Sequence, residues 1–148
     1  MLYIYGMELE EAKYCQCLYY SANALARVLT KLAEEEFAIT GLAPSYAFLL
    51  MTVNDKPGIQ PKDISGHMQL TPSTVSRLIE KMEHRGFLER KSQGKFTRVF
   101  PTEKSKRLDA KIHVAWMNLY NRYAKVLGEE RARELTSEVY QASKILIK

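Results

Sequence analysis

The residues from Thr71 to Gly86 constrain the fold more than any other part of the sequence, because both ends of one helix are marked there. The Thr71 hydroxyl can accept a hydrogen bond from a free N–H of the first turn. Pro72 suits the first helical position, where no donor is needed. Glycine readily adopts the left-handed conformation that ends many helices. The sequence therefore predicts a helix from Pro72 to about Arg85.

This helix has one apolar and one polar face. Its inward stripe follows helical spacing and consists of Val75, Leu78, Ile79 and Met82. Its outward face consists of Ser73, Thr74, Ser76, Arg77, Glu80, Lys81 and His84. Short hydroxyls near a helix N-terminus can approach phosphates and base edges, and an arginine can form two hydrogen bonds with guanine. The outward face is therefore predicted to bind DNA. Glu80 is expected to lie at the groove edge and to pair with a neighbouring basic side chain.

The segments before this helix are also helical. One helix is expected from Pro44 to the turn at residues 55–58, where proline and glycine break the pattern. A shorter helix is expected from Pro61 to about Met68, with the proline again at the first helical position. The sequence therefore predicts two helices joined by a tight turn just before residue 72.

The segment after Gly86 has a composition typical of β-strands. The runs FLERK and KFTRVF are rich in Phe, Val, Thr and Leu. They are separated by Ser92-Gln93-Gly94, which predicts a hairpin, and Pro101 closes the second strand where a ladder donor can be spared. A helical pair followed by a hairpin is the winged helix-turn-helix arrangement. The expected fold class is mainly α with a small β-hairpin wing (α+β).

Basic residues surround the predicted hairpin tip, and the charge of the chain is concentrated in this region. Residues 60–107 contain 11 Lys and Arg against 5 Asp and Glu, a net charge of +6, whereas the rest of the 148 residues sums to −1. Such asymmetry favours a polyanionic partner, and a basic hairpin suits contact with a DNA backbone. The candidate DNA contacts are Thr71, Ser73, Thr74, Ser76, Arg77, Lys81, Lys91, Lys95 and Arg98.

Apolar stripes on the helices outside the winged helix-turn-helix need a packing partner. Apolar residues step by four and three along residues 8–36, and again along residues 103–148 with a break at Gly128. Long helices with such stripes leave apolar surface in water unless they pack together or against another subunit. We therefore expect residues 1–148 to form one domain, with a DNA-binding lobe at residues 42–102 and dimerisation helices at residues 8–36 and 103–148. A symmetric homodimer is the simplest assembly.

The run from about Leu42 to Lys104 resembles the MarR family of bacterial transcriptional regulators. The resemblance is carried by LAPSYAFLL, by DISGHMQLTPSTVSRLIEKMEHRGFLERK and by VFPTEKSK. It implies a homodimeric winged-helix repressor or activator that binds pseudo-palindromic promoter DNA and is released by a small aromatic ligand or by oxidation. The wing departs from the family pattern, since Gln93 and Lys95 stand where an Asp-x-Arg pair is usual. Lys95 can still meet a phosphate, but it lacks the bidentate fork of arginine.

Two further sites follow from the resemblance as hypotheses. The run CQCLYYSA resembles the first helix of the peroxide-sensing branch, in which tyrosines hold a cysteine that is oxidised to sulfenic acid. Cys15 and Tyr19 are the corresponding candidates, and a buried small residue is the alternative for Cys15. An aromatic effector cleft could use Tyr19, Tyr46 and Trp116, although aromatic residues at helical spacing also serve simply as core.

The sequence argues against an enzyme and against a membrane protein. The three histidines share no metal-ligand spacing, and there is no glycine-rich phosphate loop or nucleophile motif. No run approaches the roughly 18 apolar residues that span a bilayer, so a cytosolic location is expected. No cofactor or metal is predicted. The alternative function is a winged-helix interaction module that binds protein or RNA without reading a DNA sequence.

Overall fold

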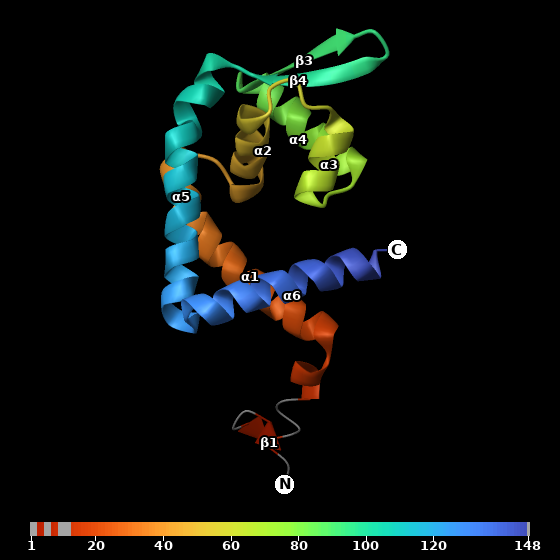
Figure 1. Ribbon diagram of the computed structural model, residues 1–148. Helices are drawn as coiled ribbons and strands as arrows, with labels where there is room; N and C mark the ends of the chain where they lie inside the picture. The colour runs from red at the N-terminus through yellow and green to blue at the C-terminus, as the bar shows by residue number, and fades with distance from the viewer. Residues whose placement is uncertain (1–2, 5–6, 9–12, 148) are drawn as a thin grey trace. The chain divides into compact units, whose positions relative to one another are not determined.

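The computed structural model describes residues 3–4, 7–8 and 13–147, which fall into two compact units with a boundary at Glu35–Glu36 (Figure 1). The first unit begins with the paired strands β1 (Tyr3–Ile4) and β2 (Met7–Glu8) and the short 3₁₀ helix η1 (Lys13–Gln16). It continues into α1 (Leu18–Phe37), which ends just inside the second unit. Within the described residues, the α-helix predicted from Glu8 begins at Leu18, where the apolar stripe that indicated it also begins. Residues 9–12 of that prediction lie outside the described residues.

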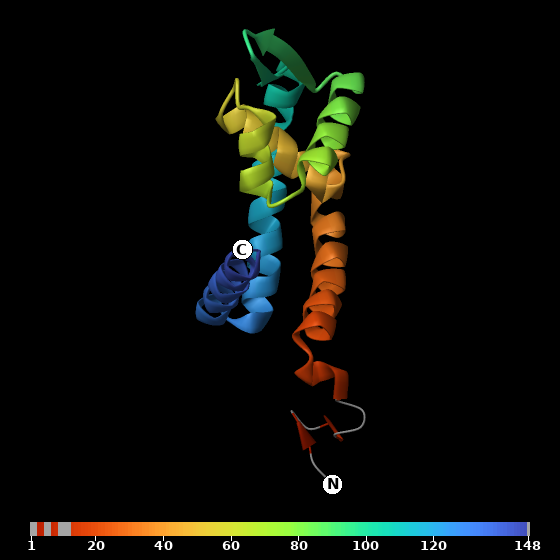
Figure 2. The same cartoon turned by 90° about the vertical axis from the view of Figure 1, so that its right-hand side faces the viewer.

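The second unit carries the winged helix-turn-helix. After η2 (Ala38–Thr40), its elements in chain order are α2 (Pro44–Asp55), α3 (Pro61–Met68), α4 (Pro72–His84), β3 (Leu88–Gln93), β4 (Phe96–Pro101), α5 (Glu103–Leu127) and α6 (Glu129–Leu146). In Figures 1 and 2, α2, α3 and α4 cluster beneath the β3–β4 hairpin, and α5 runs from the hairpin past α2. The predicted mainly helical fold with a two-stranded wing is confirmed.

The core of this unit lies among α2, α3, α4 and the base of the wing. Apolar residues from all of these elements are fully buried, including Leu49, Leu50, Val53, Ile64, Val75, Ile79, Met82 and Val99. Three of them belong to the inward stripe predicted for α4, and the fourth member, Leu78, is half-buried. Burial of this stripe fixes which face of α4 points away from the protein.

The turn between α3 and α4 is held by local hydrogen bonds. Gln69 follows α3 in the left-handed region (φ 54°), and its backbone N–H donates to the carbonyl of Ser65. The N–H of Leu70 donates to the same carbonyl at 3.2 Å, and the Ser65 hydroxyl donates to the carbonyl of Leu70. These contacts satisfy groups that a helix end leaves free. They set the direction in which α4 begins.

The wing is a hairpin with a two-residue loop. Gln93 pairs with Phe96, so the loop is Gly94-Lys95, and Gly94 has a φ of 62°. The predicted loop, Ser92-Gln93-Gly94, was placed too early, because a two-residue loop accepts a glycine with positive φ at its first position. Ser92 and Gln93 therefore extend β3.

A third short segment joins the wing at its base. Ile59 forms an isolated bridge with Val99, in which the N–H of Val99 donates to the carbonyl of Ile59 at 2.9 Å. The N–H of Gly58 donates to the carbonyl of Val99 at 2.8 Å. A bridge made by a single residue pair leaves no alternating apolar pattern in the sequence, so this bridge was not predicted. The bridge ties the wing to the α2–α3 connection.

Helix α5 is attached to the lobe by polar contacts at its start. The Thr102 hydroxyl accepts the N–H of Ser105 at 3.4 Å and lies 2.7 Å from the carbonyl oxygen of Gly86. Ser105 is fully buried and its hydroxyl donates to the side-chain oxygen of Asn54 at 2.8 Å. The Asn54 amide in turn donates to Asp109 at 3.0 Å. These bonds hold α5 against α2 and the end of α4.

Replacing Thr102 by alanine is expected to destabilise the protein by about 1–2 kcal/mol, because the change removes a helix cap and a hydrogen bond to Gly86. Urea unfolding measures the loss. Thr97→Ala is the control, because Thr97 is exposed on β4. Equal losses in the two variants would contradict the capping role.

Much apolar surface of α5 and α6 is left uncovered in this single chain. Ala132 is the buried residue of α6, whereas Val139 is 55% exposed and Leu146 is 73% exposed.

No single described helix is long and apolar enough to cross a membrane, and only Leu18–Thr40 with Pro44–Asp55 reaches that length and composition as a bent pair. Burial in the lobe already accounts for the apolar character of Pro44–Asp55.

Candidate nucleic-acid interface

The outward face of α4 is polar and accessible. Ser73, Ser76 and Arg77 are exposed, and Thr74 is half-buried in the first turn. The Thr71 hydroxyl accepts the N–H of Thr74 at 3.4 Å, which confirms Thr71 as the N-terminal cap. The free N–H groups and the positive end of the helix dipole are therefore presented together with three hydroxyl groups. This end of α4 suits a phosphate or a base edge.

Arg77 and Lys81 on the outward face of α4 have different neighbours. Arg77 directs one guanidinium nitrogen to the Thr74 hydroxyl at 3.5 Å, and the side chain is exposed. Its other N–H groups are donors that suit a bidentate partner. The Lys81 ammonium lies 5.6 Å from the centre of the Tyr46 ring, at the flank of the helix. That Arg77 reads a base and that Lys81 meets the DNA backbone stay predictions.

An ion pair links α4 to the wing. The Nε of Arg90 lies 2.6 Å from one Glu83 carboxylate oxygen, and the backbone N–H of Arg90 donates to the other at 3.2 Å. Glu83 lies on α4 and Arg90 on β3, so the two contacts fix the wing relative to the helix. The pair was not predicted, because the two residues are seven positions apart on different elements and no local pattern in the sequence marks their contact.

The basic residues of the wing are not equivalent. Lys95 lies in the loop and is exposed. Lys91 is also exposed, with its ammonium 5.0 Å from the centre of the Phe100 ring. Arg98 instead is half-buried, and its guanidinium donates to the carbonyl of Gly58 at 3.0 Å. Arg98 therefore anchors the base of the wing, and it does not surround the hairpin tip as the sequence analysis expected.

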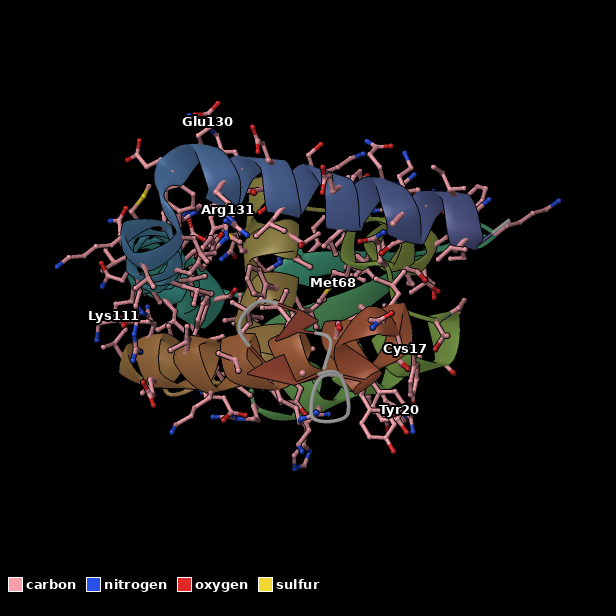
Figure 3. All side chains as sticks on the ribbon, turned by 90° about the horizontal axis from the view of Figure 1, so that it is seen from below. Cys17, Tyr20, Met68, Lys111, Glu130 and Arg131 are labelled. Atoms are coloured by element: carbon pink, nitrogen blue, oxygen red, sulfur yellow. The ribbon has the colours of Figure 1, made fainter. Side chains whose placement is uncertain are left out.

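Loss of the Lys95 charge is expected to weaken binding to every DNA sequence alike. In Lys95→Ala, the salt dependence of binding should become shallower by about one counterion per protomer, since one phosphate contact is removed. Fluorescence anisotropy titrations at several salt concentrations measure both effects. Lys111→Ala is the matched control, because Lys111 projects from α5 outside the wing (Figure 3). An unchanged salt slope in Lys95→Ala would contradict the contact.

Comparison with known proteins places the winged helix-turn-helix region beside one family. Residues 42–93, which contain α2, α3, α4 and β3, match the MarR family. The uncharacterized HTH-type transcriptional regulator YybA of Bacillus subtilis (strain 168) is 28% identical over 87 residues. That alignment covers 57% of this chain and 58% of YybA. Residues 42–93 of this chain are therefore a MarR family region.

Solved structures share the fold. A putative MarR family regulator from Listeria monocytogenes, complexed with 26mer DNA, is 22% identical, with a TM-score of 0.73 over 88% of this chain and 89% of that one. CouR from Rhodococcus jostii RHA1, bound to p-coumaroyl-CoA, is 16% identical, with a TM-score of 0.71 over 84% of this chain and 90% of that one. The winged helix-turn-helix is thus the MarR fold, and MarR proteins are transcriptional regulators, not enzymes.

The candidate thiol sensor falls partly outside what the structure describes. The side chain of Cys15 lies outside the described residues, so its role stays a prediction. Tyr19 is 70% exposed and its ring packs edge-on against Tyr20, with centroids 5.5 Å apart. Cys17 is a free thiol on the surface near Tyr20 (Figure 3). A sensor would need a partly exposed thiolate of lowered pKa.

The candidate effector residues have separate contacts. Tyr46 is half-buried on α2 beneath Lys81. Trp116 on α5 is 49% exposed and packs edge-on against Phe48, with ring centroids 6.4 Å apart. Tyr19 belongs to the first unit, whereas Tyr46 and Trp116 belong to the second. Their common pocket therefore stays a prediction.

A tyrosine-lined cleft lies between α5 and α6, and the sequence analysis did not identify it. It has a volume of about 320 Å³ and is lined by Tyr120, Tyr123, Arg133, Thr136, Ser137 and Tyr140. Burial raises the pKa of the Tyr123 hydroxyl, and the neighbouring Tyr120 raises it further. Within the described residues, no three His, Cys, Asp or Glu side chains gather as a metal site.

Proposed function

We propose that this MarR protein is a cytosolic homodimer that binds a pseudo-palindromic double-stranded DNA site and represses transcription from it. A small aromatic ligand relieves the repression. The candidate DNA contacts on α4 and the wing supply the affinity and the sequence preference. Arg98 contributes by holding the wing in position.

The observation that carries this proposal is the accessible face of α4. Its first turn presents hydroxyls and free N–H groups, and the exposed Arg77 stands one turn later. The exposed Lys91 and Lys95 lie on the wing that Glu83 and Arg90 tie to the same helix. Base reading and backbone contact thus come from one rigid lobe, as specific DNA binding requires.

The solved relatives support both parts of the proposal. The Listeria protein of the same fold was crystallised with DNA, which favours duplex DNA as the partner here. CouR carries p-coumaroyl-CoA, an aromatic thioester, which favours a small aromatic effector. The identity of the effector of this chain and the position of its pocket are separate questions.

The apolar residues left exposed on the terminal helices support a dimer. Trp116, Val126, Val139 and Leu146 belong to the predicted stripes, and they are 49%, 84%, 55% and 73% exposed, respectively. Monomeric proteins rarely expose apolar surface of this extent in one region. A second copy that covers these stripes would remove the surface from water.

The mechanism follows from symmetry. A dimer places two α4 helices in successive major grooves about one duplex turn apart, so that the bound protein blocks polymerase. An effector that binds one spacing of the two lobes better than the other shifts the population away from the DNA-binding state. The affinity for DNA then falls by an amount set by how much more tightly the effector binds the state that does not bind DNA.

Selection from a library of random duplexes, followed by hydroxyl-radical footprinting, tests the function. The recovered sequences should converge on a pseudo-palindrome, and the footprint should show two protected patches about 10 base pairs apart. A library that does not converge would overturn sequence-specific binding and leave the interaction module as the better description.

The double variant Val139→Asp, Leu146→Asp is expected to shift the protein from dimer to monomer. Charged groups on the α6 stripe oppose its burial against a second copy, and both sites are exposed in the single chain, so the fold should survive. Sedimentation equilibrium measures the mass, with Ser143→Asp on the same helix as control. A double variant that stays dimeric would place the interface elsewhere.

A further inference from the structure

A carboxylate stands on the central line of the outward face of α4. Residues 73, 77, 80 and 84 step by four, three and four, which keeps them in one line along a helix, and all four are exposed. The buried Val75, Ile79 and Met82 lie on the opposite side of the helix. Glu80 therefore shares the line of Ser73 and Arg77 on the outward face of α4.

Glu80 is also not neutralised. Among the described residues its carboxylate has no hydrogen bond and no ion pair. The nearest basic side chains along the helix have other partners: Arg77 reaches the Thr74 hydroxyl at 3.5 Å, and Lys81 lies over the Tyr46 ring. The expected pairing with a neighbouring basic residue was therefore wrong. Glu80 presents a carboxylate whose acceptor oxygens have no partner among the described residues.

The chemistry of the major groove leaves this acceptor few partners. Phosphates repel it, and so do the acceptor atoms of guanine and thymine. Adenine offers one amino donor, but its N7 and the O4 of the paired thymine flank that donor as acceptors. The cytosine amino group is a donor at the edge of its base pair, and acidic side chains accept from it. A buried carboxylate without such a donor keeps its full desolvation cost.

We propose that Glu80 selects cytosine at one base pair of each half-site and rejects the other three bases there. This inference rests on the proposed DNA-binding function and adds a second reading residue beside Arg77. Because Arg77 and Glu80 follow one another on the same line, their bases lie near one another in the half-site. The half-site should therefore combine a guanine for Arg77 with a cytosine for Glu80.

The test compares sequence selection by the full-length protein and three variants from one library of random duplexes. The wild type should recover a cytosine at one position of each half-site. Glu80→Ala should lose that preference and keep the others. Glu80→Gln should accept adenine as well as cytosine there, because a glutamine amide both donates and accepts. Asp63→Asn is the matched control, since it removes one carboxylate from the exposed side of α3.

Anisotropy with the recovered duplex, and with one in which that cytosine is exchanged in one half-site, gives the size of the effect. The exchange should weaken wild-type binding about 5- to 150-fold and should leave Glu80→Ala binding almost equal on the two duplexes. If both Glu80 variants bind all duplexes more tightly by one common factor, Glu80 acts by repulsion alone and the inference is overturned. Unchanged preference in Glu80→Ala overturns it as well.

The two possible failures are distinguishable. If the wild-type selection converges but the cytosine preference survives in Glu80→Ala, the inference fails while specific DNA binding stands. If the wild-type library does not converge at all, the proposed function fails and the inference with it. Thermal unfolding of each variant should match the wild type, because Glu80 and Asp63 are both exposed.

Discussion

Replacing Arg77 by alanine is expected to weaken binding to the selected DNA site by about 1–3 kcal/mol per half-site, while binding to random DNA changes far less. The guanidinium is the exposed group of α4 that can form two parallel hydrogen bonds with guanine, and Thr74 already orients one of its nitrogens. Alanine leaves the guanine acceptors without a protein partner. The specific complex loses this contact in both half-sites, whereas the random complex never had it.

Anisotropy titrations on the selected duplex and on a scrambled one measure this difference. Arg107→Ala is the matched control, because Arg107 is exposed on α5 and carries the same charge away from the α4 face. Arg77→Lys should fall between wild type and Arg77→Ala, since lysine keeps the charge but not the fork. If Arg77→Ala loses affinity equally on both duplexes, Arg77 contacts the backbone and reads no base.

The second large effect concerns stability. Ile79→Ala is expected to destabilise the protein by about 2–5 kcal/mol, because it leaves a cavity in a close-packed core. Ile79 is fully buried and belongs to the stripe that packs α4 into the lobe. The variant should also lose DNA binding near its lowered unfolding temperature, since the reading face exists only when this stripe is packed.

Urea unfolding followed by circular dichroism measures the loss for Ile79→Ala. The neighbouring Glu80→Ala provides the control, because it changes an exposed residue on the same helix turn and should alter stability by less than about 0.5 kcal/mol. A loss below about 1 kcal/mol for Ile79→Ala would mean that α4 is held mainly by contacts other than this stripe.

Local signals explain what could be predicted from the sequence. The bounds of α4 were predicted closely, because Thr71, Pro72 and Gly86 each have one strong conformational preference. Pro44 and Pro61 marked the starts of α2 and α3 for the same reason. The inward stripe of α4 followed from spacing alone, and the two-stranded wing followed from composition.

The errors arose where long-range packing decides the outcome. Arg98 was placed at the wing tip, but its hydrogen bond to Gly58 spans 40 positions and has no local signature. The Ile59–Val99 bridge and the Glu83–Arg90 pair were missed for the same reason. Glu80 was predicted to pair with a basic residue near it in sequence. In the folded chain, however, Arg77 contacts Thr74 and Lys81 lies over the Tyr46 ring.

The most direct test of the account is the affinity of the purified protein for its selected duplex and for a scrambled duplex of equal length, measured by fluorescence anisotropy at two salt concentrations. Neutralising several phosphates makes binding salt-sensitive, and base reading adds a preference for the selected sequence. We expect the selected duplex to bind at least about 1,000-fold more tightly than the scrambled one and both affinities to fall steeply with salt. Equal affinity for the two duplexes would mean that the outward face of α4 and the wing bind a partner other than a specific DNA sequence.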